Sequence, residues 1–290
     1  MATRSQWVAG ARPRTLPAAV APVVIGTGAA YGLGRGDPAA AVLALLLAVL
    51  LQVGVNYAND YSDGIRGTDH ERVGPVRLVG QRLAPAASVR LAAILAFAAA
   101  AVVGLSLVAL SQVWVLLPVG AAAILAAWFY TGGSRPYGYL GLGEVFVFVF
   151  FGLVATLGTT STQAHRLSAG AWAGAVGIGA ISTALLVANN LRDIPGDTAA
   201  GKLTLAVRLG DRGTRWLYAG LLAVSAGAVA VLAGSCAAVL LAVPAFVLAW
   251  PPIRLIATGA RGPSLVPALG GTARYALAYA LLLGIALALC

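Results

Sequence analysis

The chain has 290 residues, of which 60% are hydrophobic and only 10% are charged, and its formal net charge is +10. A soluble domain carries about 25% charged and about 45–50% apolar residues. This composition excludes an ordinary soluble protein and predicts an all-α protein that crosses a membrane several times. The apolar runs are long and lack period-two alternation, which excludes a membrane β-barrel.

Nine apolar stretches follow one another along the chain, each about 18–23 residues long and so able to cross a bilayer as a helix. These predicted spans cover residues 15–34, 39–59, 88–110, 113–130, 143–161, 169–190, 215–234, 236–256 and 272–290. Gly and Ala are frequent within them, and small residues let helix backbones approach closely. We therefore predict one polytopic domain over residues 1–290, built as a bundle of nine transmembrane helices.

The second span ends in the first of two acidic clusters. Its amide and carboxylate residues are Asn56, Asn59, Asp60, Asp63 and Asp69. If the helix continues to Asp63, the residues at 56, 59/60 and 63 present their oxygens in a column on one face. Gly64 and Gly67 then end the helix and let Asp69 fold back.

A segment rich in glycine and tyrosine joins the fourth and fifth spans. It contains Tyr130 and Arg135, and Glu144 begins the fifth span. Arg135 either reaches an anionic substrate or belongs to an interfacial belt of Arg and Tyr. Glu144 either orients an aromatic substrate or stabilises the N-terminus of a helix, where negative charge is favoured.

The sixth span ends in the second acidic cluster. Its polar residues are Asn189, Arg192, Asp193, Asp197 and Lys202. Because Pro195 and Gly196 separate the two aspartates, we expect the helix to end there and Asp197 to lie on a loop. Arg192 and Lys202, the only lysine in the chain, supply cations suited to a phosphate group.

The two cysteines lie in the last third of the chain, at Cys236 and Cys290. Both are in apolar runs and no CxxC spacing is present, so the sequence predicts neither a disulfide framework nor a thiolate metal site.

The basic residues determine the predicted topology. Of the 19 Lys and Arg residues, only Arg35 and Arg166 fall on one side of the nine-span arrangement. All others, including Arg4, Arg12 and Arg14, fall on the opposite side, where they serve as topological anchors. Basic loops stay in the cytoplasm, so we expect a multi-pass protein of the plasma membrane with a cytoplasmic N-terminus and an external C-terminus. Both acidic clusters then face the cytoplasm, in the long inner loops 60–87 and 191–214.

The acidic clusters are either ordinary solvated side chains or parts of a binding site. Carboxylates at helix ends are often simply solvated. Two clusters on the same side, each with flanking Asn residues, favour a site instead, because ionised carboxylates at membrane depth cost several kcal/mol. Closely spaced like charges also need a cation to neutralise them. Mg²⁺ binds through one or two carboxylates together with substrate phosphates, so the sequence predicts a site for Mg²⁺ and a diphosphate.

Four segments of the chain together resemble a known family. They are residues 11–17, residues 56–75, residues 130–144 and residues 189–209. The chain is similar throughout to the UbiA superfamily of intramembrane prenyltransferases. In the first acidic cluster, the third aspartate comes at Asp69, later than in most of that superfamily. This spacing resembles the branch that prenylates 1,4-dihydroxy-2-naphthoate.

The resemblance implies a nine-helix bundle around a central cavity, with both acidic clusters facing the cytoplasm. It implies Mg²⁺ ligands at Asn59, Asp60, Asp63, Asp69, Asp193 and Asp197. It leads us to expect substrate contacts from Asn56, Asn59, Arg66, Tyr130, Arg135, Asn189, Arg192 and Lys202, and a catalytic role for the aspartates and Glu144. The chain departs from the superfamily at Leu203, where an Arg is expected, and Arg208 is a candidate substitute.

The expected activity is Mg²⁺-dependent transfer of a polyprenyl group from polyprenyl diphosphate to 1,4-dihydroxy-2-naphthoate, with decarboxylation, giving demethylmenaquinol. The alternatives are a different acceptor, such as 4-hydroxybenzoate, haem or a phosphoribosyl sugar, and a membrane transporter. Transporters often place ionisable residues at mid-membrane, whereas the charges here lie at one face. We expect the lipid bilayer as a partner and no nucleic acid.

Overall fold

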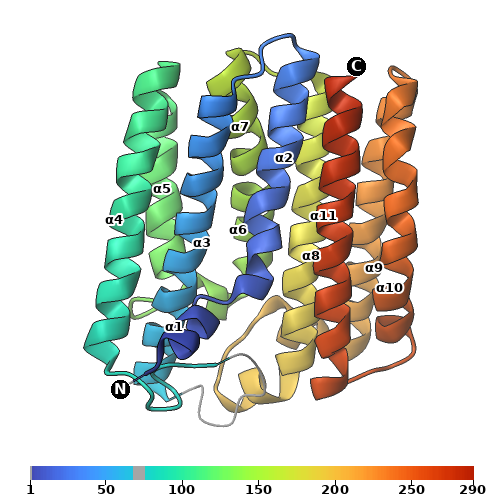
Figure 1. The fold of residues 1–290 in the computed structure, drawn as a ribbon. Helices are drawn as coiled ribbons and strands as arrows, with labels where there is room; N and C mark the ends of the chain where they lie inside the picture. Colours follow the sequence, from blue (N-terminus) through green and yellow to red (C-terminus); the bar gives the residue numbers. More distant parts are fainter. Residues whose placement is uncertain (1, 68–75) are drawn as a thin grey trace.

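The computed structural model describes residues 2–67 and 76–290, which form one bundle of helices packed side by side (Figure 1). Asp69 lies outside the described residues. The elements in chain order are α1 (Arg4–Gly10), η1 (Pro13–Thr15), α2 (Leu16–Gly32), α3 (Pro38–Arg66), α4 (Ala86–Ser111), α5 (Leu116–Phe129), η2 (Tyr137–Leu140), α6 (Gly143–Val147), η3 (Phe148–Val154), α7 (Ala155–Ala164), α8 (Ala169–Ala199), α9 (Leu205–Ala233), η4 (Ala237–Ala249), α10 (Trp250–Ala257), η5 (Gly262–Leu265) and α11 (Val266–Ala288).

The predicted spans are confirmed in number and order within the described part of the chain. Eight helical stretches there are long and apolar enough to cross a membrane, and the 14-residue α5 is a shorter apolar helix between them. Several are composite: α6, η3 and α7 run on from one another, as do η4 with α10 and η5 with α11. Large apolar side chains on the periphery are exposed, among them Val231 and Val247, as expected of a surface that faces lipid tails.

Two helices continue beyond the predicted ends of their spans. The long loop predicted at 60–87 therefore begins later, after Arg66, and the long loop predicted at 191–214 is wrong, because only residues 200–204 separate α8 from α9. The helix α3 runs on to Arg66, and Gly67 ends it in the left-handed conformation at φ 71°, which glycine adopts without steric cost. The helix α8 runs on to Ala199, and α9 begins at Leu205. The apolar run of each helix ends before the helix itself does. Helical hydrogen bonding continues past the apolar run because the polar residues that follow it are buried against neighbouring segments.

The expectation that α8 ends at Pro195 is also wrong. Pro195 lies inside the helix, where it removes one backbone donor but leaves the following turns intact. The backbone N–H of Ala200 still donates to the Gly196 carbonyl at 2.9 Å, and the N–H of Lys202 donates to the Asp197 carbonyl at 2.8 Å. Asp193 and Asp197 are therefore one helical turn apart on the same face of α8.

The main apolar core is formed by residues of α2, α8 and α11 together with residues of α9 and η4. Close contact between α2 and α11 depends on glycine. A Cβ atom placed on Gly28 would lie 2.1 Å from the carbonyl oxygen of Gly284, so only glycine allows the two backbones to touch. This is the small-residue packing expected between helices in a membrane.

The two ends of the bundle differ in character. We call the end that carries the last turns of α3 and α8 the acidic end, because Asp63 and Asp197 lie there. In Figure 1 the acidic end is at the bottom, with the N-terminus, and the C-terminus lies at the top. We call that other end the opposite end.

The two cysteines are joined in a disulfide at the opposite end, between Cys236 and Cys290. The sequence pattern did not indicate this pairing. The cysteines are 54 residues apart in the sequence, and a motif-based criterion such as CxxC does not detect such a pair. The signal was in the topology: the last two spans are antiparallel, so the start of one and the end of the next share a face.

Candidate active site

A cavity of about 1620 Å³ runs along the bundle, larger than the roughly 300–1,000 Å³ of most small-molecule pockets. At the acidic end its wall includes Asp63, Asp197 and Lys202. Near the opposite end it reaches Leu116, at the start of α5, and Thr162, near the end of α7. Most of the wall between these ends is apolar, so the cavity suits a long apolar molecule with a charged head.

The helix α3 brings three of its predicted site residues to the cavity wall: Asn56, Asn59 and Asp63. Their spacing along one helix places them on the same face. The side-chain oxygen of Asn59 accepts a hydrogen bond from the Thr131 hydroxyl at 2.8 Å. The amide of Asn56 donates to the Ala11 carbonyl at 2.8 Å and to the Thr15 hydroxyl at 3.0 Å.

Asp60, predicted as a metal ligand, lies outside the cavity wall. Its two carboxylate oxygens accept hydrogen bonds from the backbone N–H groups of Leu78 and Val79, at 2.6 and 3.2 Å. The carboxylate is almost completely buried. Asp60 thus fastens the segment that follows residues 68–75 onto α3, the helix that carries Asp63.

The second cluster is held together by charged hydrogen bonds on α8. The guanidinium of Arg192 donates twice to the Asp193 carboxylate, both at 2.7 Å, and also to the Asn189 side-chain oxygen at 2.9 Å. Such two-point pairs fix the orientation of both partners. Asn189, Arg192 and Asp197 line the cavity, while Asp193 lies behind them.

Lys202 joins the two clusters. Its ammonium group lies 3.3 Å from the Asp63 carboxylate, and both side chains are about 5% exposed or less. Moving two charges out of water costs several kcal/mol per ion, so a buried pair of this kind is weak evidence for stability and better evidence for function. The two clusters, 130 residues apart in the sequence, therefore converge on one place.

Tyr139 lies at the centre of this meeting point and was missed as a site residue. Its hydroxyl donates to the Asp63 carboxylate at 2.5 Å, and its ring lies 4.4 Å below the Lys202 ammonium. Tyr139 therefore contacts both members of the Lys202–Asp63 pair. Tyr139 was within the glycine and tyrosine segment that the sequence singled out, but nothing distinguished it from Tyr130 and Tyr137 there.

The residues at the acidic end fit Mg²⁺ and a diphosphate. Asp63 and Asp197 supply carboxylates, Asn59 and Asn189 supply amide oxygens, and Lys202 and Arg192 supply cations, all on the cavity wall. Within the described residues, no three His, Cys, Asp or Glu side chains lie close enough together to hold a metal unaided. Protein sites commonly bind Mg²⁺ through one or two carboxylates plus substrate phosphates.

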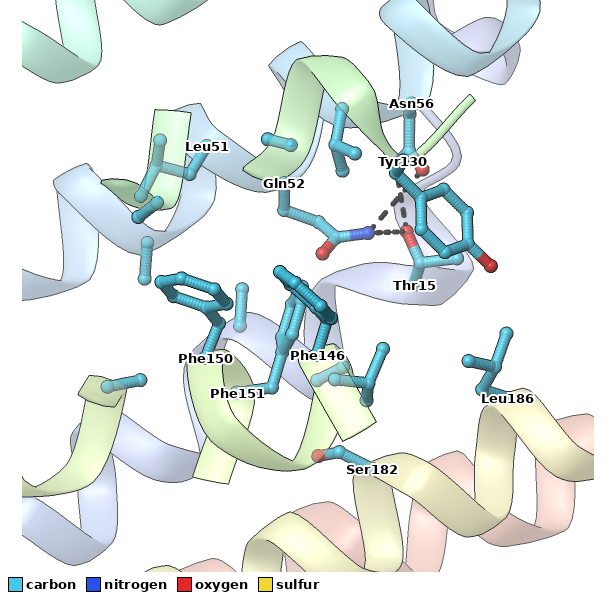
Figure 2. A pocket seen from close by; sticks show the side chains of 18 of the residues that line it. Thr15, Leu51, Gln52, Asn56, Tyr130, Phe146, Phe150, Phe151, Ser182 and Leu186 are labelled. Atoms are coloured by element: carbon cyan, nitrogen blue, oxygen red, sulfur yellow. Dashed lines mark hydrogen bonds between the residues drawn. The ribbon is translucent and has the colours of Figure 1, made fainter. Parts of the chain in front are cut away.

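Figure 2 shows a part of the cavity where aromatic and polar side chains face each other. Phe146, Phe150 and Phe151 form one wall, on a helical stretch that includes the π-helix Phe148–Val154. π-helical turns occur frequently at functional sites. Across from them, the Gln52 amide donates to the Thr15 hydroxyl at 2.9 Å.

In this part of the cavity, two buried polar atoms have no hydrogen-bond partner among the described residues. They are the Gln52 side-chain oxygen and the Ser182 hydroxyl. Both residues line the cavity. A buried polar atom without a hydrogen bond costs about 1–3 kcal/mol, and a bound ligand with polar substituents would satisfy both. Neither residue was identified from the sequence, because Gln and Ser within apolar spans have many structural roles.

Four residues proposed from the sequence lie away from the cavity wall. Glu144 accepts a hydrogen bond from Asn190 at 2.9 Å and so holds a residue that does line the cavity. Arg66 donates to the carbonyls of Thr131 and Gly133, and Arg135 is exposed. Arg208, the candidate substitute for an Arg at 203, donates to the carbonyls of Leu203 and Leu140.

Four further arginines line the cavity: Arg12, Arg14, Arg77 and Arg274. The sequence had identified Arg12 and Arg14 only as topological anchors. Partly buried Tyr137 also lines this region, and desolvation raises the pKa of its phenol. Tyr137 therefore stays protonated and donates to the Ala126 carbonyl at 2.9 Å.

The chain matches a family of known sequence and fold. The UbiA prenyltransferase family matches over residues 19–262. A protein of Mycobacterium tuberculosis named 1,4-dihydroxy-2-naphthoate octaprenyltransferase is 56% identical, over 99% of this chain and 98% of its own length. A protein of the same name from Escherichia coli is 41% identical, over 74% of this chain and 72% of its own.

Solved structures share the fold at low sequence identity. A UbiA homologue from Archaeoglobus fulgidus, bound to GPP and Mg²⁺, has a TM-score of 0.69 and 15% identity, with 96% of this chain and 99% of that chain covered. The apo structure of a UbiA homologue from Aeropyrum pernix has a TM-score of 0.69 and 14% identity, with 92% and 96% covered.

Proposed function

The chain belongs to the UbiA prenyltransferase family, and we propose that it transfers a polyprenyl group from polyprenyl diphosphate to 1,4-dihydroxy-2-naphthoate. Carbon dioxide and diphosphate leave, and the product is demethylmenaquinol. The observation that carries this proposal is the convergence of both acidic clusters, through the Lys202–Asp63 pair, at the head of a long apolar cavity. The acceptor follows from the names of relatives that are 41–56% identical.

We assign the diphosphate to the acidic end. Asp63 and Asp197, with the amide oxygens of Asn59 and Asn189, would hold Mg²⁺ together with the phosphate oxygens, and Lys202 and Arg192 would contact the diphosphate directly. Bound Mg²⁺ would neutralise the negative charge that develops on the diphosphate as it leaves. Lys202 and Arg192 do the same from the protein side, because preformed charges in a site of low dielectric stabilise developing charge without reorganisation.

Asp60 and Asp193, which the resemblance implies as ligands, act in this proposal as positioning residues. Each already has both carboxylate oxygens occupied, Asp60 by two backbone N–H groups and Asp193 by the Arg192 guanidinium. Their loss would shift the segment after residue 75 or the Arg192 side chain, respectively. Asp69 stays a proposed ligand.

The prenyl chain lies along the apolar cavity, and the ring of the acceptor occupies the part shown in Figure 2. Loss of diphosphate leaves an allylic cation, which apolar walls protect from capture by water. The ring carbon that bears the carboxylate attacks this cation, and departure of carbon dioxide then restores aromaticity. Phe146 and Phe150 stack against the ring, while the Gln52 oxygen accepts a hydrogen bond from one ring hydroxyl.

We further propose that the acidic end faces the cytoplasm, in the plasma membrane. In support, among the basic residues that the structure describes, only Arg35 and Arg166 belong to the turns at the opposite end, and basic residues are retained on the cytoplasmic side. The soluble acceptor and Mg²⁺ would then reach the site from the cytoplasm.

The test is product formation by the purified full chain in lipid nanodiscs, given labelled octaprenyl diphosphate, an equimolar mixture of 1,4-dihydroxy-2-naphthoate and 4-hydroxybenzoate, and MgCl₂. We expect a decarboxylated prenyl naphthalenediol as the main product by mass spectrometry, and its loss when EDTA replaces MgCl₂. Prenylation of 4-hydroxybenzoate instead would contradict the acceptor, and equal turnover in EDTA would contradict the metal.

A further inference from the structure

The disulfide between Cys236 and Cys290 lies at the end of the bundle farthest from the carboxylates. Cys236 precedes η4, which runs toward the acidic end, and Cys290 follows α11, which returns from it (Figure 1). The two Cα atoms are 5.9 Å apart, within the usual range for bonded cysteines. None of the residues proposed for the reaction lies near this pair.

Two separate arguments favour a position of this bond outside the cytoplasm. Disulfides persist in oxidising compartments and are rare in the cytosol, where thiols are kept reduced. The basic residues separately predict that the opposite end is external, since of those that the structure describes it carries Arg35 and Arg166 alone. A disulfide at the acidic end would have contradicted the charge asymmetry, whereas the observed one agrees with it.

The bond acts on a helix that lines the cavity. The outer half of α11 touches α2 at Gly284 and at Leu287, where Gly32 has no room for a Cβ atom. The inner part of the same helix contributes Ala273 and Leu277 to the cavity wall. Phe246 of η4 packs on the other side of α11, against Tyr275 and Tyr279. The disulfide therefore joins the end of α11 to the start of η4 at the external end of the bundle, and α11 contacts both α2 and η4.

We propose that Cys236 and Cys290 are a site of oxidative modification on the external face, where the bond forms after insertion and clamps α11 to the start of η4. The reaction is thiol–disulfide exchange with an extracytoplasmic dithiol oxidase. The two thiols lose two protons and two electrons, and the disulfide of the oxidase is reduced to a dithiol. This proposal is independent of the substrate of the enzyme.

The first test is the oxidation state of the full chain, purified without reductant from membranes treated with N-ethylmaleimide. We expect a linked peptide pair containing both cysteines and no alkylated cysteine. In intact cells, a membrane-impermeant phosphine reductant added outside should make both thiols reactive toward a membrane-impermeant maleimide. Alkylated cysteines in the untreated protein, or labelling only after the cells are permeabilised, would overturn the proposal.

The second test separates a bond from two unrelated cysteines. A bond can be lost only once, so Cys236→Ser, Cys290→Ser and the double variant should lower the unfolding temperature by the same several degrees, and reductant should have no further effect on any of them. Additive losses from the two single variants would contradict a shared bond. If a variant does not fold, the same comparison is made on the unchanged chain with and without reductant.

Discussion

At the scale of single residues, Asp60 and Asp63 show how neighbouring carboxylates divide their work. Asp63 faces the cavity and contacts Lys202 and Tyr139. Asp60, three residues earlier, faces away and holds two backbone N–H groups. The sequence placed both in one metal-binding motif, because spacing alone does not show which side of a helix faces a cavity.

Asp63→Asn should lower kcat/KM for the prenyl diphosphate by at least about 100-fold, because the neutral amide removes a metal ligand and the partner of Lys202. Asp60→Asn should lose far less activity but should lower the unfolding temperature, since one of its two backbone hydrogen bonds is lost. Asp211→Asn, at a half-exposed pair with Arg215 on α9, is the control and should stay within about twofold of the original activity. An Asp60→Asn variant as inactive as Asp63→Asn, at unchanged stability, would contradict this division.

Gln52→Leu should raise KM for the naphthoate about tenfold and leave KM for the prenyl diphosphate within about twofold. The reason is that a buried hydrogen bond to a substrate hydroxyl is worth about 1–3 kcal/mol in discrimination. Steady-state kinetics with each substrate varied in turn measures the split. Ser182→Ala, which removes the other unpartnered polar atom of this region, should have a smaller effect in the same direction. A rise in KM for the prenyl diphosphate alone would place the acceptor elsewhere.

At the scale of helices, the site depends on helical turns that extend past the apolar spans. The final turns of α3 and α8 carry Asp63 and Asp197 into the same region. On α8 the helix even passes through Pro195, so the two aspartates of that cluster share a face. Proline and glycine within a sequence usually indicate a helix end, and here the packing of buried polar side chains overrides that local signal.

Helix packing at the centre of the bundle provides a sharper prediction. Gly28→Ala should lower the unfolding temperature strongly, because the added Cβ would lie 2.1 Å from the Gly284 carbonyl oxygen and would force α2 and α11 apart. Gly120→Ala, on α5, meets no atom within 4 Å and should be neutral or slightly stabilising through its better helix propensity. Thermal unfolding of both variants in the same detergent makes the comparison. Equal unfolding temperatures would contradict the close contact between α2 and α11.

At the scale of the whole molecule, composition and span counting predicted the all-helical fold and the order of its apolar helices, of which eight in the described part of the chain are long enough to cross a membrane and α5 is shorter. The bilayer imposes length and apolarity on every span. The sequence also predicted that the two acidic clusters meet. It did not predict the individual contacts of Tyr139, Gln52 or Asp60, or the Cys236–Cys290 bond. Those depend on helix rotation and on pairings between distant segments, which periodicity in a nearly all-apolar span does not encode.

The most direct test of the central claim is a double-mutant cycle on Mg²⁺-dependent binding of a non-reactive thio-analogue of the prenyl diphosphate, measured by titration calorimetry. Both acidic clusters hold one diphosphate in this account, so Asp63→Asn and Asp197→Asn should each abolish most of the Mg²⁺-dependent affinity, and the double variant should be little worse than either. If either single variant keeps the full Mg²⁺-dependent affinity, or if the two losses simply add, the clusters do not form one site.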